Sequence, residues 1–137
     1  MISASMPRGV SAQWSSSPRR AAPNAPAKAP QAFAADQHAR ALTRRAVAQG
    51  FDRELEWIER TFVYLPMEHS EELADQDEAV RLFETLRIAL GDSTVEYAYR
   101  HRDLIRRYGR FPHRNAALGR ESTAEEQVYL AQPGAGF

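Results

Sequence analysis

The feature that most limits the fold of this chain is the scarcity and scatter of its β-branched residues. Val, Ile and Thr together account for only 15 of the 137 residues. They do not alternate with polar residues over the length of a strand. From residue 31 onward, apolar residues recur at spacings of three and four, which is the period of an amphipathic helix. The sequence therefore predicts an all-α fold, and its length fits one small domain.

Two helices are expected in the first half of this region. The first begins at a capping Asp36 and ends before Gly50. The second starts near Asp52 and ends near Leu65, because Pro66 disfavours helical conformation in the residue before it. The residues expected to face the core are Ala39, Leu42, Ala46 and Val47 in the first helix, and Leu55, Ile58 and Phe62 in the second.

Three more helices follow. The third is capped by Ser70, the fourth ends at Gly109, and the fifth begins with the capping box that starts at Thr123. The stripe of the third helix is Leu73, Val80, Phe83, Leu86 or Arg87, and Leu90. The stripe of the fourth helix is Val95, Ala98, Arg102 and Ile105, and an adjoining face contains Tyr97, His101, Leu104 and Tyr108.

The lengths of the connections predict how these helices pack. Short loops join the first helix to the second and the third to the fourth, so each pair should form an antiparallel hairpin. The first and third helices start about 34 residues apart, which is the length of one tetratricopeptide (TPR) unit, although the consensus of that repeat is absent. We therefore expect a TPR-like, right-handed array of helices.

Residues 1–30 differ from the rest of the chain. They contain four basic residues, no acidic residue and five of the eight prolines. Such a segment buries too little apolar surface to offset its ordering entropy, so we expect a disordered tail followed by a helical domain at 31–137. Over the whole chain, 18 basic residues balance 18 acidic ones. This balance, together with the absence of a long apolar run, argues against nucleic acid and membrane as partners.

The loop predicted after the fourth helix is rich in groups that bind anions. Arginine holds carboxylate or phosphate in a bidentate manner, and histidine exchanges a proton near neutral pH. One interpretation is a site for an anionic small molecule or an acidic protein segment. In the other, the arginines only cap helices and pair with Glu68, Glu71 or Asp75. The candidate ligand-binding residues of this loop are Arg110, His113, Arg114, Asn115 and Arg120.

Three histidines are candidates for acid–base chemistry beside these arginines. They are His69, His101 and His113, and a phosphorylated or carboxylated molecule would be the substrate. Whether the chain is a binding module or an enzyme stays open at this point. No metal or cofactor is expected, because acidic residues near His69 are explained by the start of a helix, and the chain has no cysteine.

Several segments carry a resemblance to a known family. They are Gln31 to Asp36, Phe62 to Gln76, His101-Arg102, and Gly109 to Thr123. Over residues 31–137 they are similar to the bacterial domain-of-unknown-function 924 family. The resemblance implies a helical, TPR-like fold in a soluble cytoplasmic protein, without an established activity. It adds Glu71 and Gln76 to the candidate ligand-binding residues. The full set of matching motif residues is His69, Ser70, Glu71, Gln76, His101, Arg110, Pro112, His113, Arg114, Asn115, Gly119 and Arg120.

The chain departs from this family at its front. Members usually begin with an aromatic-rich helical region and a segment like Leu-Asp-Gln-Phe-Pro-Arg-Asn, and residues 1–30 show neither. Helices that would cover the first hairpin are therefore missing, and which partners Leu42, Val47 and Trp57 have stays open. We favour a truncated or frame-shifted gene product, which puts stability and activity in doubt, and a non-functional product is an alternative to the binding module and the enzyme. Self-association through the first hairpin and a wrongly chosen start are the alternatives.

Overall fold

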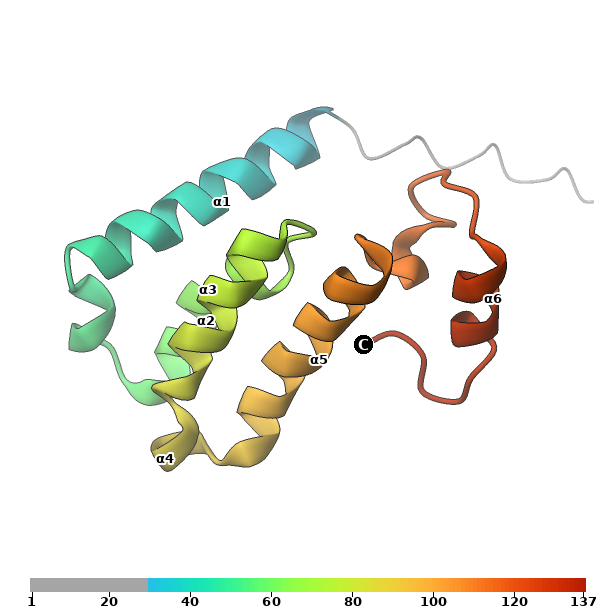
Figure 1. Cartoon of the computed structure of the whole chain (residues 1–137). Helices are drawn as coiled ribbons and strands as arrows, with labels where there is room; N and C mark the ends of the chain where they lie inside the picture. The colour runs from blue at the N-terminus through green and yellow to red at the C-terminus, as the bar shows by residue number, and fades with distance from the viewer. Residues whose placement is uncertain (1–29) are drawn as a thin grey trace, which may run out of the picture.

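The computed structural model describes residues 30–137, with side chains from residue 34 onward, and it confirms an all-α fold over that range (Figure 1). No strand occurs in these residues. The disordered tail predicted at 1–30 lies outside the described part, apart from Pro30. In chain order the elements are α1 (Pro30–Ala48), the 3-10 helix η1 (Phe51–Glu54), α2 (Trp57–Glu68), α3 (Leu73–Glu84), α4 (Arg87–Leu90), α5 (Asp92–Tyr108), the 3-10 helix η2 (Pro112–Arg114) and α6 (Ala124–Leu130).

The long helices pack on one another in sequence. α1 contacts α2, α2 contacts α3, and α3 contacts α5 along most of its length. Figure 1 shows α3 and α5 running side by side in opposite directions, with the short α4 at the turn between them. This is the second predicted hairpin, whereas the TPR-like character of the whole array stays a prediction. η2 and α6 pack together beyond the end of α5.

The start of α1 was predicted wrongly. The helix begins at Pro30, so Asp36 lies inside it and does not cap it. Proline is well suited to the first helical position, because its missing N–H has no intrahelical partner there. The predicted stop is confirmed: Gly50 adopts a left-handed conformation with φ 73° and leads into η1.

The second predicted helix differs at both ends. η1 contains its first turn, and α2 then runs through Pro66 to Glu68. Pro66 removes one backbone hydrogen bond near the end of the helix, and the burial of Met67 and Glu68 beyond it offsets this loss. With these residues included, the buried stripe of α2 is Tyr64, Met67 and Glu68, and the predicted core residues Ile58 and Phe62 are 58% and 69% exposed.

The third predicted helix is divided in two. α3 ends at Glu84, α4 begins at Arg87, and the Thr85 hydroxyl donates to the Leu82 carbonyl at 2.6 Å at the break. Ser70 is not the N-cap, which is Glu72; its hydroxyl instead accepts from the Glu72 N–H at 3.1 Å. Leu73 is also 44% exposed, because the helix begins at that residue and not at Ser70.

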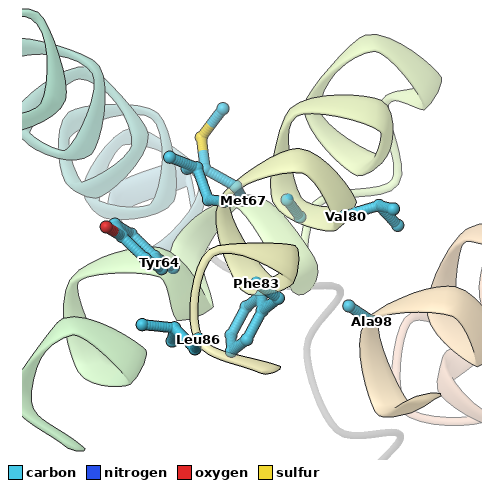
Figure 2. Packing of buried hydrophobic residues seen from close by; sticks show 8 residues of the cluster. Tyr64, Met67, Val80, Phe83, Leu86 and Ala98 are labelled. Carbon is cyan, nitrogen blue, oxygen red and sulfur yellow. The ribbon is translucent and has the colours of Figure 1, made fainter. Parts of the chain in front are cut away.

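The core lies between α2, α3 and α5 (Figure 2). Tyr64 and Phe83 meet edge to face with ring centroids 5.9 Å apart, a favoured aromatic geometry. Val80 and Leu86 confirm the predicted stripe of the third helix. On α5 the stripe of Val95, Ala98 and Ile105 is also buried, while Arg102 lies at its edge and the adjoining face is open at Tyr97, which is 50% exposed.

The first hairpin leaves apolar side chains in contact with solvent. Leu42 and Trp57 are 52% and 44% exposed, while Val47 packs partly against the core. Self-association through this face stays a prediction. Over residues 30–137, no helix combines the length and apolar character needed to span a bilayer.

The capping box at the start of α6 is confirmed. The Thr123 hydroxyl accepts from the Glu126 N–H at 3.1 Å, and the Glu126 carboxylate accepts from the Thr123 N–H at 2.9 Å. We expect Thr123→Ala to lower the free energy of unfolding by about 1 kcal/mol, the usual loss for a cap, as measured by urea unfolding. Thr123→Ser keeps the hydroxyl and is the control. Equal stability of the alanine and serine variants would contradict this role of the cap.

Candidate functional site

The loop after α5 is held to the start of α3 by a bidentate ion pair. Arg120 donates from Nη1 and Nη2 to the Glu71 carboxylate at 2.8 and 2.9 Å. Glu71 also accepts from the Phe111 N–H at 3.0 Å, and Arg120 Nε donates to Asn115 Oδ1 at 3.0 Å. Burial raises the pKa of Glu71, but the hydrogen bonds from Arg120 and Phe111 outweigh it and the pKa is lowered. This arrangement closes the loop onto the helical body.

A second closed pair joins the same loop to α6. Arg110 donates from Nε and Nη2 to the Glu126 carboxylate at 2.8 and 2.9 Å. Asn115, which is buried, donates its amide to the same carboxylate at 3.0 Å. The hydrogen bond from Arg110, followed by that from the Thr123 N–H, lowers the pKa of Glu126 to about 2. Glu126 therefore stays ionised and organises this end of the molecule.

The turn between α2 and α3 is held by buried polar side chains. Gln76 donates its amide to the carbonyls of Glu68 and Ser70 at 2.5 and 2.6 Å. The Ser70 hydroxyl donates to Asp75 at 2.7 Å, and Arg40 and Arg44 of α1 form ion pairs with the same carboxylate. The candidate Gln76 is thus a packing and hydrogen-bonding residue of the turn, and its Oε1 has no hydrogen-bond partner in the described residues.

His101 is buried on α5 and shares its surroundings with Glu68. Its Nδ1 lies 2.7 Å from the Tyr97 carbonyl and 3.3 Å from Glu68 Oε1. Burial lowers the pKa of His101 to about 4 and raises the pKa of Glu68 to about 7. Between these values the two side chains are both neutral, so the pair does not behave as an ordinary salt bridge.

The other two histidines flank His101. The rings of His69 and His101 have centroids 5.6 Å apart, and His113 lies beyond Phe111, at 5.6 Å from that ring. Burial and then the positive charge of Arg114 lower the pKa of both His69 and His113. Both are therefore neutral at pH 7, which is the state in which an imidazole accepts a proton.

Arg114 is held differently from the other two loop arginines. Its Nη1 donates to the His69 carbonyl at 3.0 Å, and its guanidinium lies 4.6 Å from the centre of the Phe111 ring. No carboxylate among residues 34–137 forms an ion pair with it. Burial lowers the pKa of Arg114, since few hydrogen bonds replace its hydration.

Arg114 lines a pocket of about 680 Å³ between α1, the α2–α3 turn and the segment after η2. Its polar walls include Arg40 and His69, and Ala39, Pro66 and Leu118 supply apolar surface. The volume lies in the range of small-molecule sites. Most of the lining residues are polar, and three of them are acidic, namely Asp36, Glu71 and Glu72. The other lining residues are Asp36, Ser70, Glu71, Glu72 and Ala117.

Apart from Gln76, which belongs to the α2–α3 turn, the predicted residues fall into three groups. Arg110, Asn115 and Arg120 are engaged in closed pairs. Only the pair of Arg120 with Glu71 agrees with the structural interpretation of the loop, because Arg110 pairs with Glu126. His101 and His113 belong to the aromatic cluster beside α5. His69 and Arg114 face the pocket, where Glu71 joins them.

Two partners were missed by the sequence reasoning. Glu126 was taken only as part of a helix cap, and nothing in its local sequence indicates that Arg110 lies opposite. The pairing of Arg40 and Arg44 with Asp75 was also missed, although the i, i+4 spacing of these arginines on one helix face was a usable signal. Among residues 34–137, no three His, Asp or Glu side chains gather as a metal site would require.

Comparisons with known proteins agree with this structure. The family model described as "Bacterial protein of unknown function (DUF924)" matches residues 24–134. A solved structure titled "Structure of Protein of Unknown Function ATU0120 from Agrobacterium tumefaciens" is 39% identical and superposes with a TM-score of 0.64. The match covers 74% of this chain and 56% of that one. No curated protein matches significantly. The chain therefore belongs to this bacterial family of proteins of unknown function.

Proposed function

We propose that the chain is a binding module that holds the anionic group of a small molecule in the pocket lined by Arg114. The observation that carries this proposal is that the Arg114 guanidinium forms no ion pair among residues 34–137. Arg110 and Arg120 are neutralised by Glu126 and Glu71, whereas Arg114 lies in the pocket without a carboxylate partner among residues 34–137. A desolvated arginine of this kind favours a carboxylate or phosphate, which it can bind with two parallel hydrogen bonds.

The surroundings of Arg114 support the same conclusion. Its stacking on Phe111 and its bond to the His69 carbonyl fix the guanidinium before a ligand arrives, which reduces the entropic cost of binding. The lowered pKa of Arg114 reflects a burial cost that a bound anion would offset. Arg40 adds a second positive charge to the lining, although it is already paired with Asp75.

Anion-dependent stabilisation tests this proposal. At a phosphate or acetate concentration of 100 times the dissociation constant, the free energy of unfolding should rise by about 2.7 kcal/mol. Arg114→Ala should abolish the rise, as followed by thermal unfolding with circular dichroism at 222 nm. Arg45→Ala is the matched control, since it removes the same charge from an exposed position of α1.

Three outcomes would overturn the proposal. They are no stabilisation by either anion, equal stabilisation of the Arg114→Ala variant, and loss of the effect in Arg45→Ala as well. Stabilisation by an acidic peptide but by neither small anion would instead favour an acidic protein segment as the partner.

A second candidate function is acid–base catalysis at the same pocket. The observation that favours it is the position of His69, which lines the pocket beside Arg114 while His101 lies behind it. A neutral His69 could take a proton from a phosphorylated or carboxylated substrate that Arg114 orients.

Histidine titration by NMR separates this candidate from simple binding. We expect the pKa of His69 to lie below 6.5 in the unliganded protein, because burial and Arg114 both lower it. Added phosphate should raise that pKa by offsetting the charge of Arg114, and Arg114→Ala should raise it without phosphate. A His69 pKa that responds to neither change would remove the catalytic candidate.

A further inference from the structure

A second cavity lies at the other end of the first hairpin, remote from Arg114 in the sequence. It has a volume of about 230 Å³ and is bounded by η1, α2 and α3. Asp52 and Tyr64 lie in its wall, and Trp57, Arg60 and Arg81 surround the space next to them. None of these residues takes part in the proposed anion pocket.

Asp52 carries the argument for a ligand. The residue is 6% exposed, and its Oδ2 accepts from the Tyr64 hydroxyl at 2.5 Å. Its Oδ1 is buried as well and has no hydrogen-bond partner among the described residues. A buried carboxylate oxygen without a donor is costly, so native structures supply one from protein, water or ligand. Tyr64 already serves Oδ2 and stays protonated, since burial and then Asp52 raise its pKa to about 12.

Two arginines that line the cavity indicate which other chemical group a ligand needs. Arg60 stacks on Trp57, with its guanidinium carbon 4.3 Å from the ring centre. Arg81 uses Nε and Nη2 for Glu78, which leaves Nη1 for another partner. Arg60 donates from Nε to the Leu55 carbonyl at 3.1 Å and from Nη2 to the Arg53 carbonyl at 2.8 Å, which leaves its Nη1. Asp52 Oδ1 thus lacks a donor among the described residues, and the Nη1 atoms of the two arginines can donate to a negatively charged acceptor.

We propose that this cavity binds a small carboxylate that carries a hydroxyl or amino group on the neighbouring carbon. The hydroxyl or amino group donates to Asp52 Oδ1, the carboxylate lies against the guanidinium groups of Arg60 and Arg81, and the carbon chain contacts Trp57. The volume accommodates a molecule of a few carbon atoms, and the apolar side chains of Val47 and Leu82 complete the wall.

Trp57 provides a direct readout. The chain has two tryptophans, so Trp14→Phe leaves Trp57 as the single reporter. In this background, lactate, alanine and propionate form a matched series in which the group on the second carbon is hydroxyl, amino or hydrogen. We expect a saturable change in fluorescence with lactate or alanine, and binding at least tenfold weaker with propionate. Equal response to all three, or no saturable response, would overturn the proposal.

Two variants locate the effect. Asp52→Asn retains an oxygen for Tyr64 but presents an amide group in place of one carboxylate oxygen, so it should remove the preference for lactate or alanine over propionate. Arg81→Gln, in a side chain that is 59% exposed, should weaken all three probes without unfolding the protein. Arg114→Ala should leave the titrations unchanged, which separates this site from the anion pocket. Unchanged binding in both Asp52→Asn and Arg81→Gln would refute it.

Discussion

Replacing Glu68 with glutamine is expected to stabilise the protein by about 3 kcal/mol at pH 8 while changing its stability little at pH 4.5. Burial raises the pKa of Glu68 in the folded state from 4.5 to about 7. Between these values the folded protein keeps a proton that the unfolded chain has released, so stability falls as pH rises through this window. Glutamine has the shape of the protonated acid and does not titrate, and each pKa unit is worth about 1.4 kcal/mol.

His101 has the opposite pH dependence. Burial lowers its pKa from 6.5 to about 4. Between these pH values His101 is protonated in the unfolded chain and neutral in the folded protein. Its contribution to stability is therefore present above pH 6.5 and is lost as pH falls towards 4. From pH 4.5 to 6.5 the folded and unfolded pairs each hold one proton, and the two dependences cancel. Glu68→Gln removes the pH dependence that is due to Glu68, so the stability of the variant should rise with pH in this range because of His101 alone.

Urea unfolding at several pH values between 4.5 and 8 measures this effect. The difference in unfolding free energy between Glu68→Gln and the parent chain should grow with pH up to about 7 and then stay constant. Glu96→Gln is the control, because it neutralises an exposed carboxylate on α5. If both variants differ from the parent by a constant amount at every pH, Glu68 ionises as an exposed residue does and the prediction fails.

Short sequence motifs correctly predicted those features of the fold that depend only on neighbouring residues. The left-handed Gly109 that ends α5 and the reciprocal bonds of Thr123 are both properties of a few neighbouring residues. Pro66 shows the limit of this approach. The proline costs the helix a backbone hydrogen bond and disfavours helical conformation in the residue before it, and the burial of Met67 and Glu68 against the rest of the molecule outweighs this. Burial of that kind is decided by distant parts of the chain.

The same distinction applies to the candidate site. Composition and spacing identified the loop of arginines, and the pairing of Arg120 with Glu71 was one of the two interpretations left open. Arg114 differs from Arg120 because Arg120 pairs with Glu71, a carboxylate that is more than 40 residues away in the sequence. Which arginine of the loop finds such a partner is decided by the tertiary structure. A single sequence does not carry that information. Likewise, Glu68 and His101 are both neutral between about pH 4 and pH 7 because they are buried together. Neither residue type indicates this by itself.

Replacing Glu71 with glutamine is expected to lower the free energy of unfolding by about 2 kcal/mol and to loosen the loop over residues 109–122. The variant leaves the partly buried Arg120 guanidinium without its bidentate acceptor and weakens the bond from the Phe111 N–H. Removing one partner of a fully buried pair costs about 3–5 kcal/mol, and we discount this because both side chains are about one quarter exposed.

A double-mutant cycle with Arg120→Gln distinguishes the ion pair from general effects of either substitution. If the pair acts as a unit, the double variant should be less destabilised than the sum of the single variants by about 1 kcal/mol or more. Glu72→Gln is the control, because Glu72 is the next residue along the chain and its carboxylate is exposed, so this substitution should change the stability little.

The cycle also tests whether the closed pairs support the proposed pocket. Glu71 holds the loop from which Arg114 reaches the His69 carbonyl, so loosening that loop should weaken anion-dependent stabilisation although Arg114 itself is intact. The opposite result, full anion response in Glu71→Gln, would show that Arg114 is fixed by Phe111 and His69 alone. In that case the ion pair stabilises the loop but does not position the binding residue.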